Sequence, residues 1–204
     1  MILRNIILTL AGLVLPVMCF AGNDYAAWAT RSKNGSWTRL TESAVRKTNL
    51  PRARPHDASH FCPAYKKLRR PERVKFWAAL VSAVAGAESS FEPKATSPQG
   101  FRTSRVTPAI SRGLLQLDKE SAGHKKYNCS IMHDIALYDP VTNLTCGVKI
   151  LAIWVDNDNT IATYKNDRSP QGGGKYWGTL RQSNHSFRNI VGYTRELQFC
   201  KKPA

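Results

Sequence analysis

The fold of this chain is decided by one apolar stretch, which reads RVKFWAALVSAVAGAESSFEP from position 73 to position 93. Counting back from Glu88, the offsets that share one face of an α-helix all carry apolar residues, namely Ala85, Val84, Val81, Ala78, Trp77 and Val74. The pattern predicts a helix over 71–89, with Pro71 in its first turn. Glu88 stands at the end of this apolar face.

A carboxyl group in that position is placed toward the core side of its helix. Burial disfavours the charged form of a carboxyl group, so we expect the pKa of Glu88 to be raised. A protonated carboxyl group is the form that a general acid requires. The stretch thus places Glu88 where a general acid could lie, a position that many structural glutamates also occupy.

The remaining sequence predicts a mainly α fold. Asp139 and Pro140 begin a second long helix, because Asp caps a helix and Pro suits its first position. That helix is expected to run to about residue 156, and a last helix is expected over 187–199. Residues 94–112 form a loop that could hold one small β-hairpin. Shorter helices are expected near 58–68, 113–117 and 161–164.

The first 21 residues have the pattern of a secretory signal peptide. They carry one charge, Arg4, and an apolar run up to Phe20, followed by a small residue, Ala21, at the expected cleavage site. We therefore expect a secreted or periplasmic protein. An uncleaved membrane anchor is the alternative, although the run is short for a spanning helix. A lipid anchor on Cys19 is less favoured, because no small residue directly precedes it.

Cysteine usage agrees with export. Four cysteines lie outside the signal segment, and an even number in an exported chain indicates two disulfides. Three pairings are open. We favour Cys129 with Cys146, which closes a short loop, and Cys62 with Cys200, which ties the ends of the domain together. No two cysteines have the spacing of a zinc site.

The chain is strongly basic, with 30 Lys and Arg against 14 Asp and Glu and a net charge of +16. Residues 31–75 alone contain 13 basic and 3 acidic residues. Such a segment is either a solvated face or a surface that attracts polyanions such as anionic cell-wall polymers. The aromatic residues are scattered and lack the stacking pattern of a nucleic-acid module, so nucleic acid is not an expected partner.

Two short motifs resemble a metal site and a phosphate loop but do not indicate either. Residues 56–60, which read HDASH, resemble a zinc protease motif with Asp in place of Glu. That motif works only on a long packed helix, so His56 and His60 are interpreted as surface histidines. The glycine run at 172–174 is not a phosphate loop, because Lys175 is followed by Tyr176 rather than Ser or Thr. No metal or other cofactor is expected.

Several motifs in order give the chain its family resemblance. It closely resembles the soluble-type lytic transglycosylases, which share the lysozyme-like fold with goose-type lysozymes. The residues that carry the resemblance are Glu88-Ser89-Ser90-Phe91, Pro93, Ala95, Ser97-Pro98, Ser111-Arg112-Gly113-Leu114-Leu115-Gln116, Leu137-Tyr138-Asp139-Pro140, Asn143, Gly147, Leu151 and Ala162-Thr163-Tyr164. The match spans about 74–164.

The resemblance implies a division of the chain and a reaction. Residues 1–21 would be the signal peptide, 22–70 a basic N-terminal arm or extension, with 22–50 extended or loosely packed, and 71–204 the lysozyme-like catalytic domain. The substrate would be the glycan strand of peptidoglycan, cut at the β-1,4 bond between N-acetylmuramic acid and N-acetylglucosamine. We expect a monomer that forms 1,6-anhydro products and needs no cofactor.

The resemblance also implies roles for particular residues. Glu88 would protonate the glycosidic oxygen and return as base, and Tyr164 would orient it. Ser97 and Ser111 would shape the site or hydrogen-bond within it, while Gln116 would contact the sugar or the loop after Glu88. Asn166 is a further substrate-binding candidate, displaced by one position because Lys165 follows the tyrosine where the family usually has Asn. The loop before Gly113 is also longer than usual and adds Arg102 and Arg105.

Two alternatives remain open. The first is a lysozyme-type hydrolase acting on native or deacetylated peptidoglycan, which would use a second carboxylate. Its candidates are Glu92, Asp118 and Asp158, although each also suits a turn or surface helix. The second is a cationic cell-wall-binding protein that has kept the fold and lost the chemistry.

Overall fold

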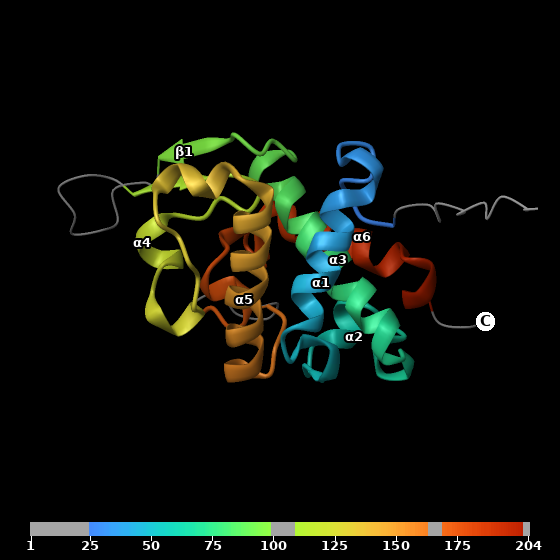
Figure 1. Ribbon diagram of the computed structural model, residues 1–204. Coiled ribbons are helices and arrows are strands. Elements are labelled where there is room, and N and C mark those ends of the chain that lie inside the picture. Colours follow the sequence, from blue (N-terminus) through green and yellow to red (C-terminus); the bar gives the residue numbers. More distant parts are fainter. Residues whose placement is uncertain (1–24, 99–108, 163–168, 202–204) are drawn as a thin grey trace, which may run out of the picture.

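The computed structural model describes residues 25–98, 109–162 and 169–201. Within these ranges the chain is mainly helical and has one two-stranded antiparallel sheet, as the sequence predicts (Figure 1). The α-helices are α1 (Ser36–Arg46), α2 (Ala58–Phe61), α3 (Arg70–Ser89), α4 (Lys119–Ala122), α5 (Pro140–Asp158) and α6 (His185–Glu196). The strands are β1 (Thr96–Pro98) and β2 (Ile110–Arg112). The 3-10 turns are η1 (Lys33–Gly35), η2 (Leu50–Arg52), η3 (Tyr65–Lys67), η4 (Lys125–Tyr127), η5 (Asp134–Tyr138), η6 (Gly173–Lys175), η7 (Gly178–Leu180) and η8 (Gln198–Cys200).

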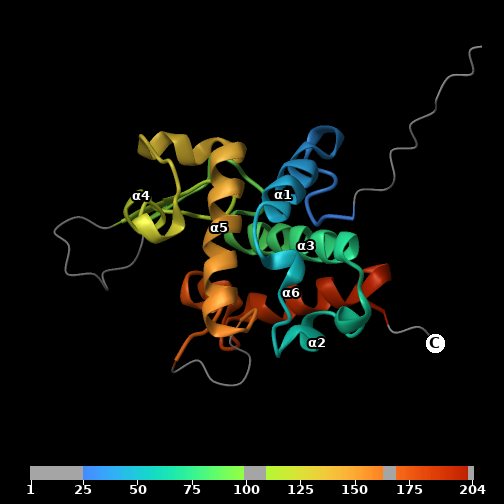
Figure 2. The same cartoon turned by 60° about the horizontal axis from the view of Figure 1, so that its bottom comes forward.

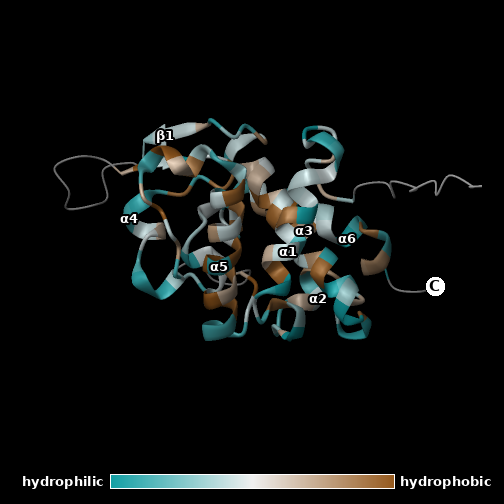
Figure 3. Cartoon of the chain, viewed as in Figure 1, coloured by the Kyte–Doolittle hydropathy of each residue, from teal (hydrophilic) through white to brown (hydrophobic). Residues whose placement is uncertain are grey.

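Helix α3 lies at the centre of the molecule. In Figure 2 it runs between α1 and α6, and α5 crosses its direction beside the end that carries Glu88. Between Arg73 and Ala85, Lys75 is the one exposed residue, so this stretch is buried on nearly every side rather than along one face. Figure 3 accordingly shows apolar residues along the visible part of the helix. Because α3 passes through the centre of the molecule, side chains at its two ends lie in different parts of the structure.

The interpretation of residues 22–50 as an extended or loosely packed arm is wrong for the part described from residue 25. This part contains α1, and Trp28, Val45 and Leu50 are fully buried in the same core as α3. The inner face of α1 includes Thr38 and Thr41 beside apolar residues. Because short polar side chains fill half of that buried face, no apolar period is visible in the sequence.

Two of the shorter expected helices are not found in the described part of the chain. Residues 113–116 form a tight turn in which Gly113 and Gln116 have φ angles of 77° and 46°, and an α-helix cannot contain such left-handed backbone. In the expected 161–164 helix, Ala162 forms an isolated antiparallel bridge with Gly172 instead. The last helix begins at His185 and ends at Glu196, so the end of the expected span is the separate turn η8.

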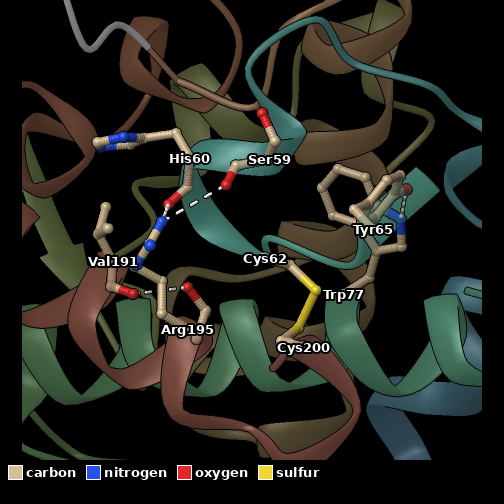
Figure 4. Close-up of a disulfide and its surroundings, with 9 residues drawn as sticks. Ser59, His60, Cys62, Tyr65, Trp77, Val191, Arg195 and Cys200 are labelled. Atoms are coloured by element: carbon tan, nitrogen blue, oxygen red, sulfur yellow. Dashed lines mark hydrogen bonds between the residues drawn. A yellow bond between two sulfur atoms is a disulfide. The ribbon is translucent and has the colours of Figure 1, made fainter. Parts of the chain in front are cut away.

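The two disulfides join the favoured pairs. Cys62 bonds Cys200 across 138 positions of sequence, and Cys129 bonds Cys146 across 17. Figure 4 shows the first bond between the segment after α2 and the C-terminal turn. The guanidinium of Arg195 also donates to the carbonyl oxygen of His60 at 2.9 Å. The C-terminal end of the chain is therefore fastened to the segment that precedes α3.

The HDASH segment has a structural role in this fold. Asp57 is buried, and its carboxylate accepts hydrogen bonds from the backbone N–H groups of Ile161 (2.8 Å) and Ala162 (3.0 Å). His56 is exposed, and His60 stacks on Phe187. Among the described residues no group of three or more His, Cys, Asp or Glu side chains is arranged to hold a metal ion. In the same residues, every helix is too short or too polar to cross a membrane.

Candidate active site

Glu88 lies in the last turn of α3, where the helix reaches the edge of the core. Thr179, in η7, donates a hydrogen bond from its hydroxyl to Oε1 of Glu88 at 2.5 Å. Burial raises the pKa of the Glu88 carboxyl above its usual value, and the bond from Thr179 offsets part of that rise because it stabilises the charged form. The environment therefore favours a protonated carboxyl group held in one orientation.

Ser89 connects the end of α3 to the turn at 113–116. Its hydroxyl contacts the carbonyl oxygens of Ala85 at 3.0 Å and Leu114 at 2.9 Å. The next two residues, Ser90 and Phe91, have positive φ angles, so the chain turns sharply after the helix. Phe91 folds back onto Gly86, where an added Cβ would lie 2.7 Å from its ring. The position of Glu88 is thus tied to a turn that lies 25 residues further along the chain.

Two further side chains, Asn143 and Trp177, also hold the turn at 113–116. Asn143 of α5 accepts a bond from the N–H of Leu115 at 2.8 Å and donates to the carbonyl oxygens of Arg112 (2.9 Å) and Leu137 (2.8 Å). The indole N–H of Trp177 donates to the carbonyl oxygen of Leu115 at 2.9 Å. These bonds give partners to the N–H and the carbonyl oxygen of Leu115, which lie in a buried turn without a regular hydrogen-bond ladder.

Gln116 acts within the same turn. Its side-chain NH₂ donates to the carbonyl oxygens of Gly113 (2.9 Å) and Ala95 (3.1 Å). Of the two roles expected for it, these bonds correspond to contact with the loop after Glu88. Ala95 immediately precedes the hairpin, in which Ser97 of β1 pairs with Ser111 of β2. The structure therefore brings Ser97 and Ser111 together, with Ser97 exposed and Ser111 buried.

A cavity of about 660 Å³ lies beside β2 and α4. Arg112, Asp118 and Asp134 are among the residues that line it, and Arg112 forms an ion pair with Asp134 at 3.3 Å. Glu88 does not line this cavity. The cavity and Glu88 are connected through β2 and the turn at 113–116. Arg112 of β2 lines the cavity, and Leu114 in the turn accepts a hydrogen bond from Ser89, next to Glu88.

Tyr176 is a functional candidate that the sequence analysis missed. Its hydroxyl is buried and makes no hydrogen bond within the described residues. Burial raises the pKa of the Tyr176 phenol, and the negative charges of Asp118 and Glu88 contribute to that rise. The phenol is therefore a neutral donor that lies within electrostatic reach of both carboxyl groups. The glycine run before it was the available signal, because it allows the backbone to pack closely at η6.

Comparison with known proteins places this geometry in a family. Residues 69–169 match the family described as the transglycosylase SLT domain. The solved structure of wild-type Bd0314 DslA is 35% identical, covers 86% of this chain and 97% of that chain, and superposes with a TM-score of 0.79. The chain belongs to the SLT transglycosylase family. A glutamate-to-glutamine variant of Bd0314 DslA, 34% identical over 88% of this chain and 100% of that chain, gives a TM-score of 0.81. No curated protein matches the chain.

Membership of the SLT family supports a lytic transglycosylase-type function, which is a glycosidase activity with peptidoglycan as its substrate. The mainly α, lysozyme-like fold expected from the sequence is also shown. The match includes α3, the hairpin, the turn at 113–116 and α5. Thr179 and Tyr176 lie after the matched residues, so the SLT motifs alone could not have identified them.

The three candidate second carboxylates of an SLT-type hydrolase differ in their surroundings. Glu92 is exposed and accepts a bond from the N–H of Lys94 at 3.0 Å. Asp158 holds the N–H of Gly172 at 2.7 Å and the ammonium of Lys175 at 2.8 Å. Asp118 caps α4 through the N–H of Ser121, but it is buried rather than on a surface helix and it lines the large cavity. Asp118 is therefore the strongest candidate of the three.

Tyr164, Asn166, Arg102 and Arg105 lie outside the described residues. The base of the segment that carries Tyr164 and Asn166 is described. Ala162 pairs with Gly172, and Gly173 donates its N–H to the carbonyl oxygen of Ile161 at 2.8 Å. The assignments of Tyr164 as an orienting residue and of Asn166 as a substrate contact stay predictions.

Proposed function

We propose that this SLT-family protein cleaves the β-1,4 bond between N-acetylmuramic acid and N-acetylglucosamine in peptidoglycan, and that it releases 1,6-anhydro products. Glu88 is the general acid and then the general base of this reaction. Ser97 and Ser111 shape the sugar-binding surface beside it, and Tyr164 and Asn166 complete the site. The protein acts after export, as a secreted or periplasmic enzyme whose signal peptide is cleaved near Ala21.

The observation that carries this proposal is the state of Glu88. Its carboxyl group is largely removed from water, its pKa is raised by burial, and Thr179 fixes one of its oxygens. A carboxyl group with a raised pKa keeps its proton to higher pH than an exposed glutamate, and donation to a glycosidic oxygen requires that proton. The ties through Ser89 and Leu114 keep it aligned with the hairpin.

The proposed reaction needs one carboxyl group in two steps. The proton of Glu88 goes to the glycosidic oxygen as the bond between that oxygen and the anomeric carbon breaks. The 6-hydroxyl of the same muramic acid residue then forms a new bond to the anomeric carbon, and its proton returns to Glu88. The substrate's acetamido group stabilises the charge at the anomeric carbon between these steps. No water is consumed, and Glu88 ends the cycle protonated.

One observation favours a second candidate function, a lysozyme-type hydrolase. Asp118 is buried beside the 660 Å³ cavity, and its charge and that of Glu88 both influence the Tyr176 phenol. A second carboxylate on the far side of a bound sugar could activate water, which would give reducing ends instead of anhydro ends. Asp118→Asn would then abolish cleavage, whereas in the anhydro-forming reaction the same change leaves the product unaltered.

Export is supported by the two disulfides, since such bonds persist in oxidising compartments. The net charge of +16 also suits a protein that works on anionic cell-wall polymers. Mass spectrometry of the N-terminus of the protein recovered from its native compartment tests the cleavage site. A mature chain that still begins at Met1 would contradict it.

The decisive experiment is digestion of purified peptidoglycan by the wild type, by Glu88→Gln and by a matched control, Glu92→Gln. We expect the wild type and Glu92→Gln to release fragments with anhydro ends, and Glu88→Gln to be slower by about 10²–10⁴-fold. Mass spectrometry separates anhydro ends from reducing ends. Unchanged cleavage by Glu88→Gln would remove the proposed acid, and wall binding without any released fragment in the wild type would favour the non-catalytic alternative.

A further inference from the structure

A second, much smaller cavity lies at the opposite end of α3 from Glu88. Its volume is about 90 Å³, and the residues that line it include Arg54, His56, Ser59, Tyr65, Lys66 and Arg73. None of the described residues that line it is acidic. Arg73 and Glu88 are 15 residues apart on one helix, which at 1.5 Å per residue separates them by about 22 Å. The small cavity is therefore distinct from the candidate active site.

The acidic residues nearest in sequence are engaged elsewhere. Asp57 directs both carboxylate oxygens to the N–H groups of Ile161 and Ala162. Glu72 accepts the N–H of Arg69 at 2.8 Å, at the start of α3. Among the described residues, the cavity thus has three cationic residues in its lining and no carboxylate to balance them.

Arg73 is the unusual member of the set. Its side chain belongs to the buried part of α3, with 7% of its surface exposed, and its Nε atom has no hydrogen-bond partner within the described residues. The guanidinium carbon lies 5.2 Å from the centre of the Tyr65 ring, so a cation–π contact provides part of its stabilisation. A buried guanidinium cannot lose its proton, so an unpaired N–H group there is costly unless an anion completes it.

The walls of the cavity are fixed before any ligand arrives. The hydroxyl of Tyr65 donates to the carbonyl oxygen of Ala53 at 3.1 Å and accepts the indole N–H of Trp77 at 3.1 Å. Figure 4 shows Ser59 and Tyr65 on either side of the segment that the Cys62–Cys200 disulfide fastens. A preformed site spends little binding energy on ordering its own side chains.

We propose that this cavity is a binding site for a single phosphate group. Its volume of about 90 Å³ is several times the roughly 10–15 Å³ that one water molecule requires on the same measure, so it has room for a small anion. A phosphate group carries up to two negative charges and offers several oxygens, so Arg54, Lys66 and Arg73 can each bind one. A carboxylate offers one charge and two oxygens, which is fewer of both than inorganic phosphate offers.

The site goes beyond the proposed glycosidase reaction and does not depend on it. Its phosphate can belong to a free ion or to a phosphate-bearing polymer of the cell envelope. In the second case the protein would hold the wall at one end of α3 and cut glycan at the other. The two sources share the same chemistry and are separated by the probes used below.

The test is isothermal titration calorimetry on the full mature chain with both disulfides intact. The site variant is Arg54→Gln with Lys66→Gln. The matched control is Arg52→Gln with Lys67→Gln, which removes the same two charges from exposed neighbours that do not line the cavity. The probes are inorganic phosphate, glycerol phosphate and a poly(glycerol phosphate) chain, with acetate for comparison, all at one ionic strength.

We expect the wild type and the control to bind phosphate at one saturable site, and the site variant to bind on the order of 100-fold more weakly. Tighter binding of the polymer than of the free ion would assign the site to the polymer, and the reverse would assign it to the free ion. No saturable phosphate binding, an equal loss in both variants, or equal affinity for acetate would overturn the proposal. Peptidoglycan cleavage should be the same in all three proteins, so failure here is distinguishable from failure of the proposed function.

Discussion

The two ends of α3 deal with a buried charged residue in opposite ways. At the C-terminal end, Glu88 can give up its charge, and burial raises its pKa so that the neutral form is favoured. At the N-terminal end, Arg73 cannot give up its charge and lies against the ring of Tyr65 with one N–H unpaired. The same apolar helix therefore carries a carboxyl group that tends to keep its proton at one end. At the other end it carries a guanidinium whose Nε–H has no partner among the described residues.

The difference shows how one buried helix can support two kinds of site. Burial changes the protonation of a weak acid, which suits catalysis by proton transfer. Burial leaves a guanidinium charged and instead increases the benefit of an anionic partner. The two disulfides lie in different parts of the molecule, since Cys62–Cys200 joins the segment before α3 to the C-terminal turn and Cys129 lines the large cavity.

The largest expected effect is the loss in the free energy of unfolding when either disulfide is removed. A cross-link stabilises more when it closes a longer loop of the unfolded chain. We expect replacement of Cys62 and Cys200 by Ser to lower the free energy of unfolding by about 5 kcal/mol, and of Cys129 and Cys146 by about 3 kcal/mol, from their separations of 138 and 17 residues. Urea denaturation of both variants measures the two values. A larger loss from the shorter loop would contradict the ranking.

The second prediction concerns the rigidity of the Glu88 end. Asn143→Ala leaves the N–H of Leu115 and the carbonyl oxygens of Arg112 and Leu137 without their partners in a buried turn. We expect a loss of about 3 kcal/mol or more in the free energy of unfolding, with slower peptidoglycan cleavage in the folded fraction. Thr145→Ala, a half-exposed change on the same helix, should alter stability by less than about 0.5 kcal/mol. Equal effects of the two changes would show that the turn is not held by Asn143.

Sequence reasoning located the C-terminal end of α3 better than the N-terminal end. The apolar face before Glu88 and the ordered motifs after it were sufficient to predict α3, the hairpin, α5 and the raised pKa of Glu88. The packing of residues 25–50 was not predictable from periodicity, because Thr38 and Thr41 occupy a buried face of α1. Thr179 reaches Glu88 across 91 positions by a single hydroxyl, which no local pattern signals.

The small cavity lined by Arg54, Lys66 and Arg73 could not be predicted from the sequence for a related reason. The sequence indicated a basic segment over 31–75 but could not separate exposed lysines and arginines from the buried Arg73. Nor could it show that Asp57, inside a motif that resembles a metal site, spends its carboxylate on the backbone of Ile161 and Ala162. The second fact depends on contacts between segments about 100 residues apart, which no local pattern reveals.

A third prediction compares the two charged residues directly. The folded-state pKa of Glu88 is raised, so its protonated form supports folding fully below the unfolded-state pKa, and this support is lost as pH rises through the folded-state pKa. Glu88→Gln should therefore match the wild type in stability below about pH 4 and exceed it as pH rises toward 8. Thermal unfolding across that pH range measures the difference. A variant that is less stable at pH 8 would contradict the raised pKa.

Arg73→Met should behave differently at the other end of α3. Removing a buried guanidinium whose Nε–H has no partner among the described residues should raise the free energy of unfolding by about 1 kcal/mol in phosphate-free buffer, after the loss of the contact with Tyr65. Because a guanidinium does not titrate, this gain should be constant from pH 4 to pH 9. Added phosphate should stabilise the wild type and not the variant. A gain that followed pH as in Glu88→Gln would remove the contrast between the two ends.

The smallest expected effect is the most specific to the candidate acid. Thr179→Val keeps the shape of the side chain and removes the hydrogen bond to Oε1 of Glu88. Because that bond stabilises the charged carboxylate, its loss should raise the pKa of Glu88 further and move the high-pH limb of kcat/KM upward. The looser carboxyl group should also cost about 1 kcal/mol of transition-state stabilisation, about fivefold in kcat/KM at the optimum. Thr194→Val, whose hydroxyl bonds only the carbonyl oxygen of Val191 within α6, is the control and should leave the limb in place. If the high-pH limb of the kcat/KM profile moved to lower pH in Thr179→Val, the titrating acid would be a group other than Glu88. The contrast between the two ends of α3 would then no longer include a catalytic acid.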